Sequence, residues 1–394
     1  MKIDPRLTDW TPEFAAWRQD FHAHPEIAYQ EHRTAALVAE RLKSFGLEVT
    51  TGIGGTGVVG TLRQGRLGKP GGNRAIALRA DMDALPMDEA TDLAYRSQNP
   101  GRMHACGHDG HTTMLLAAAR YLAETRNFAG TIHFIFQPAE EGGAGALRMI
   151  EDGLLERFPF DAVFGAHNDP TLPVGQLSAS PGPVMAATDD ITIRLTGRGG
   201  HAARPHFAVD PLLAGAQIVL GLQTIVSRRV DPLLSTVVSI CTFHAGSATN
   251  VIPETATLSG TIRNLNPAMQ KRLAVEIPDM IRHLARGAGV EAEIEYESGY
   301  PPVVNDAAMV DVVARAAGTV LDADDIHTDL PPSLGGEDFA YYALHRPACF
   351  YRIGQNDGTK GGMPLHHPRY DFNDAILPVG AAIFAAIAAG DLPA

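Results

Sequence analysis

The sequence has few cysteines and no excess of basic residues. Its three cysteines, Cys106, Cys241 and Cys349, are scattered along 394 residues. Their odd number and wide spacing do not fit a disulfide framework, so we expect reduced thiols. Lysine and arginine number 32 against 45 aspartates and glutamates, which gives a formal net charge of -13. This acidity argues against a general nucleic-acid-binding protein, because phosphate recognition normally requires a basic surface.

A long hydrophobic run is also missing. The most apolar stretch, residues 376–389, is too short to cross a bilayer and contains Pro378 and Gly380. We predict that it forms a buried terminal helix. Residues 1–10 have no apolar run behind a basic start, the pattern typical of a secretory signal. We therefore expect a cytoplasmic protein with neither a membrane nor a nucleic-acid partner.

What the chain does have is the composition of a globular protein. Hydrophobic residues make up 45% of the sequence and charged residues 20%, which is far from the composition of disordered chains. The length of 394 residues exceeds what a single hydrophobic core usually accommodates. We therefore predict two domains.

Both ends of the chain alternate helix-like and strand-like segments. Residues 14–45 show apolar positions at helical spacing up to Gly46, which is typical of a helix and its C-terminal cap. Residues 65–73, rich in glycine and basic residues, predict an exposed hairpin tip. The alternation indicates an α/β domain. Strands are predicted at 47–50, 58–62, 75–79, 131–136 and 162–166, and helices at 112–123 and 145–152.

The pattern changes in the middle of the chain. Strands are predicted there at 190–196, 235–245, 254–263 and 291–300, and helices at 210–226 and 267–287. This β-α-β-β-α-β order is that of a ferredoxin-like α+β domain. After Pro301 and Pro302 the α/β character returns. We therefore predict a catalytic domain made of residues 1–186 and 302–394, interrupted by an inserted domain of residues 187–301.

The densest group of metal-ligand side chains is the segment HACGHDGH at residues 104–111. Thiolate and imidazole suit borderline-soft divalent metals such as zinc, and the spacing of Cys106 and His108 allows them to grip one ion or two adjacent ions. The alternative is a glycine-punctuated turn whose histidines cap a helix or form ordinary hydrogen bonds.

Two adjacent carboxylates, Glu140 and Glu141, follow the predicted strand at 131–136. The carboxyl ends of strands are where open α/β sheets carry their sites. One carboxylate of such a pair can bind metal while the other transfers protons. The alternative is a solvated acidic pair stabilised by a helix dipole.

Two more positions extend the set of candidate ligands. His167 follows the predicted strand at 162–166, and His366 and His367 lie in a segment broken by prolines, where either can be a ligand. A lone histidine is more often structural. The candidates come from four separate segments, however, and two metal ions that share a bridging ligand need about that many protein ligands. The resulting set is Cys106, His108, Glu141, His167 and His366, with Glu140 left for general-base work.

One motif points away from this interpretation. The segment GIGGTG at residues 52–57 matches the dinucleotide-binding pattern GxGxxG. That pattern requires a helix directly after the glycines, so that its N-terminus can meet the pyrophosphate. Residues 58–62 are typical of a strand instead. We interpret the segment as a glycine-rich turn that binds no nucleotide.

Several motifs, taken in order, closely resemble the M20 peptidase family. The resemblance extends from His22 to Asn373, and within the family it is to the amidohydrolase branch that contains hippurate hydrolase and the plant auxin-conjugate hydrolases. It implies a zinc-peptidase-like α/β catalytic domain with an inserted lid and dimerisation domain, and a homodimer or homotetramer formed through that lid. The motifs are RADMDALP (79–86), HACGHDGH (104–111), QPAEE (137–141), GAH (165–167), GRGGHA (197–202), NVIP (250–253), GEDF (336–339) and LH (365–366).

The resemblance also implies a metal centre. It implies two divalent metal ions per subunit, with zinc as the first choice and manganese, nickel or cobalt as alternatives. Cys106 would bridge the two ions, where other branches of the family use an aspartate. Asp81 stands where those branches carry a histidine ligand. The implied ligands are Cys106, His108, Glu141, His167 and His366.

The remaining roles implied by the resemblance concern catalysis and substrate binding. Glu140 would be the catalytic base, and Asp83 would orient a metal ligand. His201 would stabilise the oxyanion, in its own or a neighbouring subunit. Asn250 and Arg263 would hold the free carboxylate of the substrate, for which the planar fork of arginine is well suited.

The expected reaction is metal-dependent hydrolysis of the amide bond of an N-acyl or N-aroyl amino acid. Water activated by the metals would attack the carbonyl with Glu140 as base, and the products would be a carboxylic acid and a free amino acid. One alternative is a dipeptidase or aminopeptidase that acts on short peptides. Another is a metal-binding or ligand-binding homologue that has lost catalysis.

Overall fold

The chain folds into two compact units in the computed structural model, which describes residues 1–64 and 74–392. The main unit contains Met1–Gly182, Val304–Pro331 and Asp338–Ala394, and the inserted unit contains Pro183–Val303 and Pro332–Glu337. The hairpin tip predicted at 65–73 lies outside the described residues.

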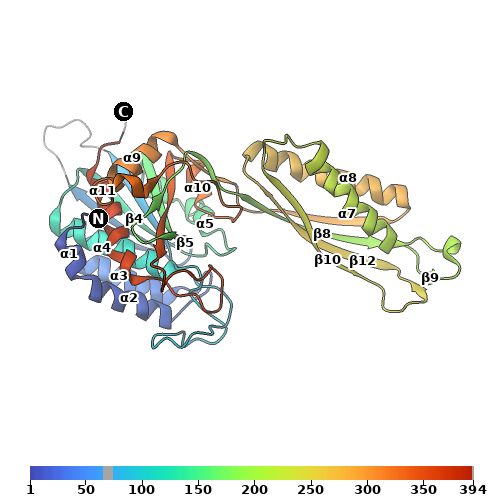
Figure 1. The fold of residues 1–394 in the computed structure, drawn as a ribbon, viewed down its shortest axis with the longest axis horizontal. Coiled ribbons are helices and arrows are strands. Elements are labelled where there is room, and N and C mark those ends of the chain that lie inside the picture. Colours follow the sequence, from blue (N-terminus) through green and yellow to red (C-terminus); the bar gives the residue numbers. More distant parts are fainter. Residues whose placement is uncertain (65–73, 393–394) are drawn as a thin grey trace. The chain divides into compact units, whose positions relative to one another are not determined.

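The main unit is built around an eight-stranded mixed sheet with the order β1-β2-β4-β3-β5-β16-β6-β15 (Figure 1). β3, β4, β5 and β16 run parallel, whereas β1, β2 and β4 pair antiparallel. The parallel strands are buried on both faces, which explains their near-continuous apolar sequences. The strands are β1 (Glu48–Ile53), β2 (Gly57–Gln64), β3 (Ala75–Asp81), β4 (Gly130–Gln137), β5 (Ala162–Pro173), β6 (Leu177–Ser178), β15 (Ile326–His327) and β16 (Ala348–Asn356). β2, not a helix, follows the GxGxxG segment, as predicted.

Helices cover this sheet. α4 packs against α2 and α11, and the apolar helix α11 is almost entirely buried, as its sequence predicted. None of the helices in the described part of the chain has the length and apolarity that crossing a membrane requires. The helices of the main unit are α1 (Pro5–Asp9), α2 (Thr11–Ala23), α3 (His32–Ser44), α4 (His108–Thr125), α5 (Gly145–Glu151), α6 (Leu154–Arg157), α9 (Ala307–Ala317), α10 (Ala340–Ala343) and α11 (Leu377–Ala389), with short 3-10 turns η2 (Ala323–Asp325) and η3 (Asp374–Ile376).

One predicted helix is wrong in its extent. Residues 14–45 form two helices, because α2 ends at Ala23 and α3 begins at His32. Pro25 disfavours a helical conformation at the residue before it, and Tyr29 has a φ of 61°. The helical periodicity continues across this break, so the apolar pattern alone did not reveal it.

The inserted unit is a four-stranded antiparallel sheet in the order β10-β12-β8-β13, with α7 and α8 packed side by side on one face (Figure 1). The predicted ferredoxin-like order is confirmed. Its elements are β8 (Ala187–Thr196), β9 (Gly200–His201), η1 (Pro205–Phe207), α7 (Pro211–Arg228), β10 (Thr236–Ala245), β11 (Val251–Ile252), β12 (Thr255–Asn264), α8 (Pro267–Ala288) and β13 (Glu291–Ser298). Cys241 is exposed on the edge strand β10. Two short strands, β7 (Gly182–Met185) and β14 (Val303–Asn305), lie where the chain passes between the units.

Candidate metal centre

The candidate ligands gather at the carboxyl edge of the main sheet. β3 ends at Asp81, β4 ends at Gln137 just before the two glutamates, and β5 carries His167. Parallel strands bring their carboxyl ends to one edge of a sheet. α4 begins at the same edge with His108, after Gly107 in a left-handed conformation with φ 93°. A Cβ at Gly107 would lie 2.3 Å from Asn168 Oδ1, so only glycine permits this turn.

The five predicted ligands converge as two groups that share Cys106. The ligand atoms of Cys106, His108 and His167 lie within 4.8 Å of one another, and so do those of Cys106, Glu141 and His366. The Cys106 sulfur is 3.4 Å from His167 Nε2. A thiolate common to two groups of donors suits a pair of cations with one bridging ligand. The sequence pattern did not determine this distribution of ligands between two positions.

Hydrogen bonds select the ring nitrogen that each buried histidine offers. His108 Nδ1 lies 3.2 Å from Asp83 Oδ1, and His167 Nδ1 lies 2.7 Å from the carbonyl oxygen of Asn168. Nδ1 donates in both contacts, because the partners are acceptors. In the neutral rings Nε2 is then left with a free lone pair, and His108 Nε2 is buried without a hydrogen-bond partner among the described residues. Such orphaned nitrogens are the arrangement that a metal ion satisfies.

His366 enters the cluster from a loop near the C-terminus. Its φ of 60° is uncommon for a residue with a side chain. Its backbone N–H donates to the carbonyl oxygen of Ala105 at 2.8 Å, which fixes the loop beside Cys106. His366 Nε2 lies 3.3 Å from Glu141 Oε1, and this contact raises the pKa of His366. The side chain is 53% exposed, so the cluster opens to solvent on this side.

The electrostatics of the cluster favour a cation. Burial, together with Glu141 and Glu140, raises the pKa of the Cys106 thiol well above its usual range. Burial lowers the pKa of His108, but neighbouring carboxylates, with Asp81 first, outweigh it and raise that pKa to about 10. Both shifts reflect excess negative charge at a buried place. A divalent cation would offset this charge and stabilise the thiolate, so the donor set fits a borderline-soft metal.

Asp83 ties the two glutamates to His108. Its Oδ1 accepts hydrogen bonds from the Glu140 N–H at 3.0 Å and from His108, and its Oδ2 accepts the Glu141 N–H at 2.9 Å. One buried carboxylate thereby sets the backbone direction of both glutamates and the ring orientation of a ligand. Glu140 is buried, and its ligand atom lies within 4.8 Å of those of His108 and Glu141. This places a potential base directly beside the metal ligands.

Sequence reasoning left His111 and Asn168 without a role. His111 Nδ1 lies 2.6 Å from Asp81, and His111 Nε2 lies 2.7 Å from Asn168 Oδ1. Asp81 also forms an ion pair with the buried Arg79 at 2.7 Å. These contacts make Asp81 the anchor of His111, whose ring stacks on that of His108. Their positions in the sequence could have indicated a role near the ligands, since His111 lies one helical turn after His108 and Asn168 directly follows His167.

His104 belongs to the same motif and lies in a different environment. It is buried, and neither ring nitrogen has a hydrogen-bond partner among the described residues. Burial lowers the pKa of His104 to about 4, which keeps the ring neutral. The three histidines of the segment 104–111 therefore divide into a neutral buried ring, a metal-ligand candidate and a partner of Asp81.

The inserted unit brings His201 and Asn250 together. β9 and β11 pair with His201 opposite Val251, and the Ala202 N–H donates to the carbonyl oxygen of Asn250 at 3.0 Å. His201 Nδ1 accepts the Ala203 N–H at 3.1 Å. In the neutral ring the proton is then on Nε2, which is free to donate. Both His201 and Asn250 are exposed.

Arg263 lies at the other end of the inserted sheet. It is opposite Thr188 and Val237 in the register of β12, whereas β12 begins beside β11 at Thr255. Eight residues separate Thr255 from Arg263, which is roughly 26 Å along an antiparallel strand. Within one inserted unit, Arg263 therefore does not reach the place where Asn250 lies.

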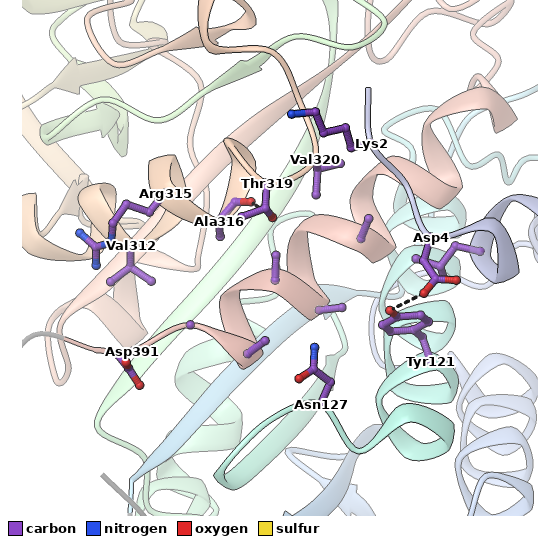
Figure 2. Close-up of a pocket in the computed structure, with 16 residues that line it drawn as sticks. Lys2, Asp4, Tyr121, Asn127, Val312, Arg315, Ala316, Thr319, Val320 and Asp391 are labelled. Atoms are coloured by element: carbon purple, nitrogen blue, oxygen red, sulfur yellow. Dashed lines mark hydrogen bonds between the residues drawn. The ribbon is translucent and has the colours of Figure 1, made fainter. Parts of the chain in front are cut away.

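A separate hollow of the main unit lies away from the ligands. A cavity of about 530 Å³ lies between α4, α9, α11 and the N-terminal segment. Figure 2 shows residues that line it, among them Tyr121, whose hydroxyl donates to Asp4. Alanines of α11 form its floor. Tyr121 follows His108 by 13 residues on α4, about 20 Å along the helix axis. Since none of the candidate ligands lines this cavity, we do not connect it with the metal centre.

Comparison with known proteins shows the family of the chain. The sequence profile of peptidase family M20/M25/M40 matches residues 77–390. The chain is 40% identical to hippurate hydrolase of Campylobacter jejuni, over 98% of this chain and 99% of the relative. It is 38% identical to an IAA-amino acid hydrolase of Arabidopsis thaliana, over 94% and 84%. The YXEP protein of Bacillus subtilis, a dinuclear metal-binding peptidase from the M20 family, superposes with a TM-score of 0.82 at 34% identity, covering 97% of this chain and 98% of that one.

Proposed function

Since the chain belongs to peptidase family M20/M25/M40 and is one of its metal-dependent amidohydrolases, we propose that it hydrolyses the amide bond of N-acyl amino acids to a carboxylic acid and a free amino acid. One observation carries the proposal: two groups of metal donors share Cys106 beside the buried Glu140. The names of the relatives, hippurate hydrolase and IAA-amino acid hydrolase, support the substrate class.

The residues of the main unit have separate tasks in this reaction. Cys106, His108, Glu141, His167 and His366 would hold two divalent cations. When bound, these cations lower the pKa of water toward neutrality and polarise the amide carbonyl. Glu140, held by its backbone N–H to Asp83, takes the proton from the attacking water and later delivers it to the leaving amine.

In this proposal the inserted unit supplies further polar contacts to the substrate. His201 donates through Nε2 to the oxygen that becomes negative in the tetrahedral intermediate, and the hydrogen bond at its Nδ1 supports this tautomer. Asn250, directly before the paired strand β11, and Arg263 bind the free carboxylate of the substrate. In this proposal the inserted unit is the lid.

The separation of Asn250 from Arg263 bears on assembly. If both residues bind one carboxylate, they must come from different subunits, because roughly 26 Å of β12 lies between their positions in one unit. This supports a homodimer, alone or within a homotetramer, in which one lid provides His201 and Asn250 and the other provides Arg263.

A substrate screen tests the proposed function. The metal-free protein is reconstituted with zinc, manganese, cobalt or nickel and assayed with N-acetyl and N-benzoyl amino acids and with unblocked dipeptides. We expect hydrolysis of the N-acyl amino acids with at least one metal and little turnover of the dipeptides. Preferential cleavage of dipeptides would indicate a peptidase instead. Absence of any turnover with a fully loaded protein would indicate a homologue that has lost catalysis.

A further inference from the structure

The turn that carries Glu140 has an unfavourable backbone. Ala139, directly before Glu140, has a φ of 54° and is completely buried, and Ala144 has a φ of 53°. Residues with a Cβ rarely adopt this left-handed conformation. A Cβ at Gly143 would lie 2.6 Å from that of Ala139, so the turn is also tightly wound. Contacts from outside the turn must therefore hold it in this shape.

Glu31, between α2 and α3, makes such a contact. Its carboxylate is completely buried, and Oε1 accepts the N–H of Ala139 at 2.9 Å and that of Tyr29 at 3.0 Å. Oε2 accepts the Thr56 hydroxyl at 2.5 Å. The Tyr29 hydroxyl in turn donates to the carbonyl oxygen of Gly143 at 2.6 Å. A segment far from Glu140 in the sequence thus holds both ends of its turn.

Glu31 and Asp83 bind neighbouring backbone N–H groups of the turn. Glu31 accepts the N–H of Ala139, and Asp83 accepts those of Glu140 and Glu141. Three consecutive backbone N–H groups therefore point at two buried carboxylates, as in an anion-binding nest. Asp83 also binds a metal ligand, whereas Glu31 has no such contact among its hydrogen bonds in the described chain. Glu31 therefore reaches the turn without contacting a candidate metal ligand.

Thr56 gives the glycine-rich segment 52–57 a role. Thr56 is buried, with 6% of its surface exposed, in the turn between β1 and β2. Its hydroxyl donates to Glu31. The Gly54 N–H is bound by Asp152, just beyond α5, at 2.9 Å. The segment that resembled a nucleotide-binding motif thus connects Glu31 with the element that follows the Glu140 turn.

We propose that Glu31 is a positioning residue for catalysis: its carboxylate holds the left-handed conformation of Ala139 and thereby aims Glu140. The inference rests on the proposed function, because Glu140 is the base only if the chain is an amidohydrolase. It predicts that the need for Glu31 diminishes when residue 139 tolerates a left-handed backbone without support, as glycine does.

Four variants test this role. Glu31→Met keeps the volume and removes the acceptor; we expect kcat to fall roughly 10- to 100-fold, with KM within about threefold and metal content unchanged. Glu31→Gln keeps an acceptor for Ala139 and should remain close to wild type. Glu31→Met combined with Ala139→Gly should recover most of the lost kcat. Glu26→Met is the matched control, because Glu26 accepts the N–H groups of Arg33 and Thr34 on the same segment and does not touch the turn.

Hydrogen exchange of the peptide spanning residues 137–147 gives a readout without substrate. Exchange at Ala139 should accelerate in Glu31→Met, which lacks the acceptor of this N–H, and stay at the wild-type rate in Glu26→Met. If the wild type hydrolyses no N-acyl amino acid, the proposed function fails, and this exchange still tests the contact with the turn.

Two outcomes overturn the inference. One is a Glu31→Met protein with a lowered melting temperature but a kcat, per metal-loaded molecule, within twofold of wild type. The other is a double variant no better than Glu31→Met. If Glu31→Met does not fold, the double variant carries the test, and its failure to fold as well would reduce Glu31 to a structural residue.

Discussion

The main unit and the inserted unit carry their candidate residues in opposite ways. In the main unit Cys106, His108 and Glu140 are buried at the edge of a sheet, and Asp83 from another segment fixes His108 and Glu140. In the inserted unit His201, on the two-residue strand β9, and Asn250, directly before β11, are exposed, and the contacts described for them are to backbone groups. Folding of the main unit therefore positions its candidate ligands and base before any substrate binds. The groups of the inserted unit become useful only against a substrate or another subunit.

The largest effect is expected from removing the proposed base of the main unit. Glu140→Gln keeps the shape of the side chain, so metal content and melting temperature should stay close to wild type. We expect kcat to fall roughly 10³- to 10⁴-fold, which corresponds to about 4 to 5.5 kcal/mol in the barrier. Steady-state kinetics and metal analysis check this, with Glu151→Gln on the surface of α5 as the control. Retention of substantial activity would reject Glu140 as the base.

The next largest effect concerns the stability of the protein at acid pH, to which the two units should contribute differently. Burial, followed by the positive charge of Arg63, lowers the pKa of His133 to about 4, and the residue is 3% exposed. His133 binds a proton more readily in the unfolded chain than in the folded one. Its contribution to the free energy of unfolding is therefore fully present above pH 6.5 and is lost as the pH falls toward 4. The full loss is about 3 kcal/mol. The histidines of the inserted unit, His201, His206, His244 and His283, are all exposed and provide no such buried neutral ring.

Denaturant unfolding of the metal-free protein at pH 7.5 and pH 4.5 measures this loss. In His133→Asn, which does not titrate, the decrease in unfolding free energy between the two pH values should be smaller by about 2.5 kcal/mol. His283→Asn, on the surface of α8, should behave like wild type. An equal pH dependence of wild type and His133→Asn would contradict the assigned cause.

Removal of the proposed oxyanion donor tests whether an exposed residue matters. His201→Ala should leave the fold intact and lower kcat roughly 100-fold, or about 2.7 kcal/mol. His206→Ala, in the same exposed loop, is the matched control. Mixed dimers of His201→Ala and Glu140→Gln subunits should regain activity if the lid of one subunit serves the other. A kcat of His201→Ala within a few-fold of wild type would remove His201 from the mechanism.

The smallest expected effect concerns substrate binding. Arg263→Ala should raise KM roughly tenfold for substrates with a free carboxylate, because a hydrogen bond to a charged group is lost. Substrates whose carboxylate is converted to an amide should show no such change. Arg194→Ala, an exposed arginine of the same sheet, is the control. An equal rise of KM for both kinds of substrate would assign Arg263 to folding rather than recognition.

The sequence predicted the order of elements because each has a clear periodicity. The strands of the main sheet can be recognised from their apolar sequences without knowledge of the fold. The same holds for β8, whose alternating residues Ile191, Ile193 and Leu195 are buried. The convergence of Cys106 and Glu141 was also predictable, because metal-ligand types recurred after strands whose carboxyl ends share one edge.

What the sequence did not reveal depends on backbone conformation and on contacts between remote segments. The left-handed φ of Ala139 and His366 leaves no mark in residue type, since neither is glycine. The role of Glu31 requires knowing that the turn after β4 passes beside the break between α2 and α3. The distance between Asn250 and Arg263 likewise follows from strand register, which separate motifs do not contain.

The three thiols differ enough to be told apart chemically. Cys106 and Cys349 are buried with raised pKa values, so in the metal-free protein neither presents the thiolate that alkylating reagents attack. Cys241 is exposed on the edge strand of the inserted unit. A maleimide probe should therefore modify this one position of the unaltered protein, so that spin or fluorescence labels could follow movements of the inserted unit during turnover without any engineered cysteine.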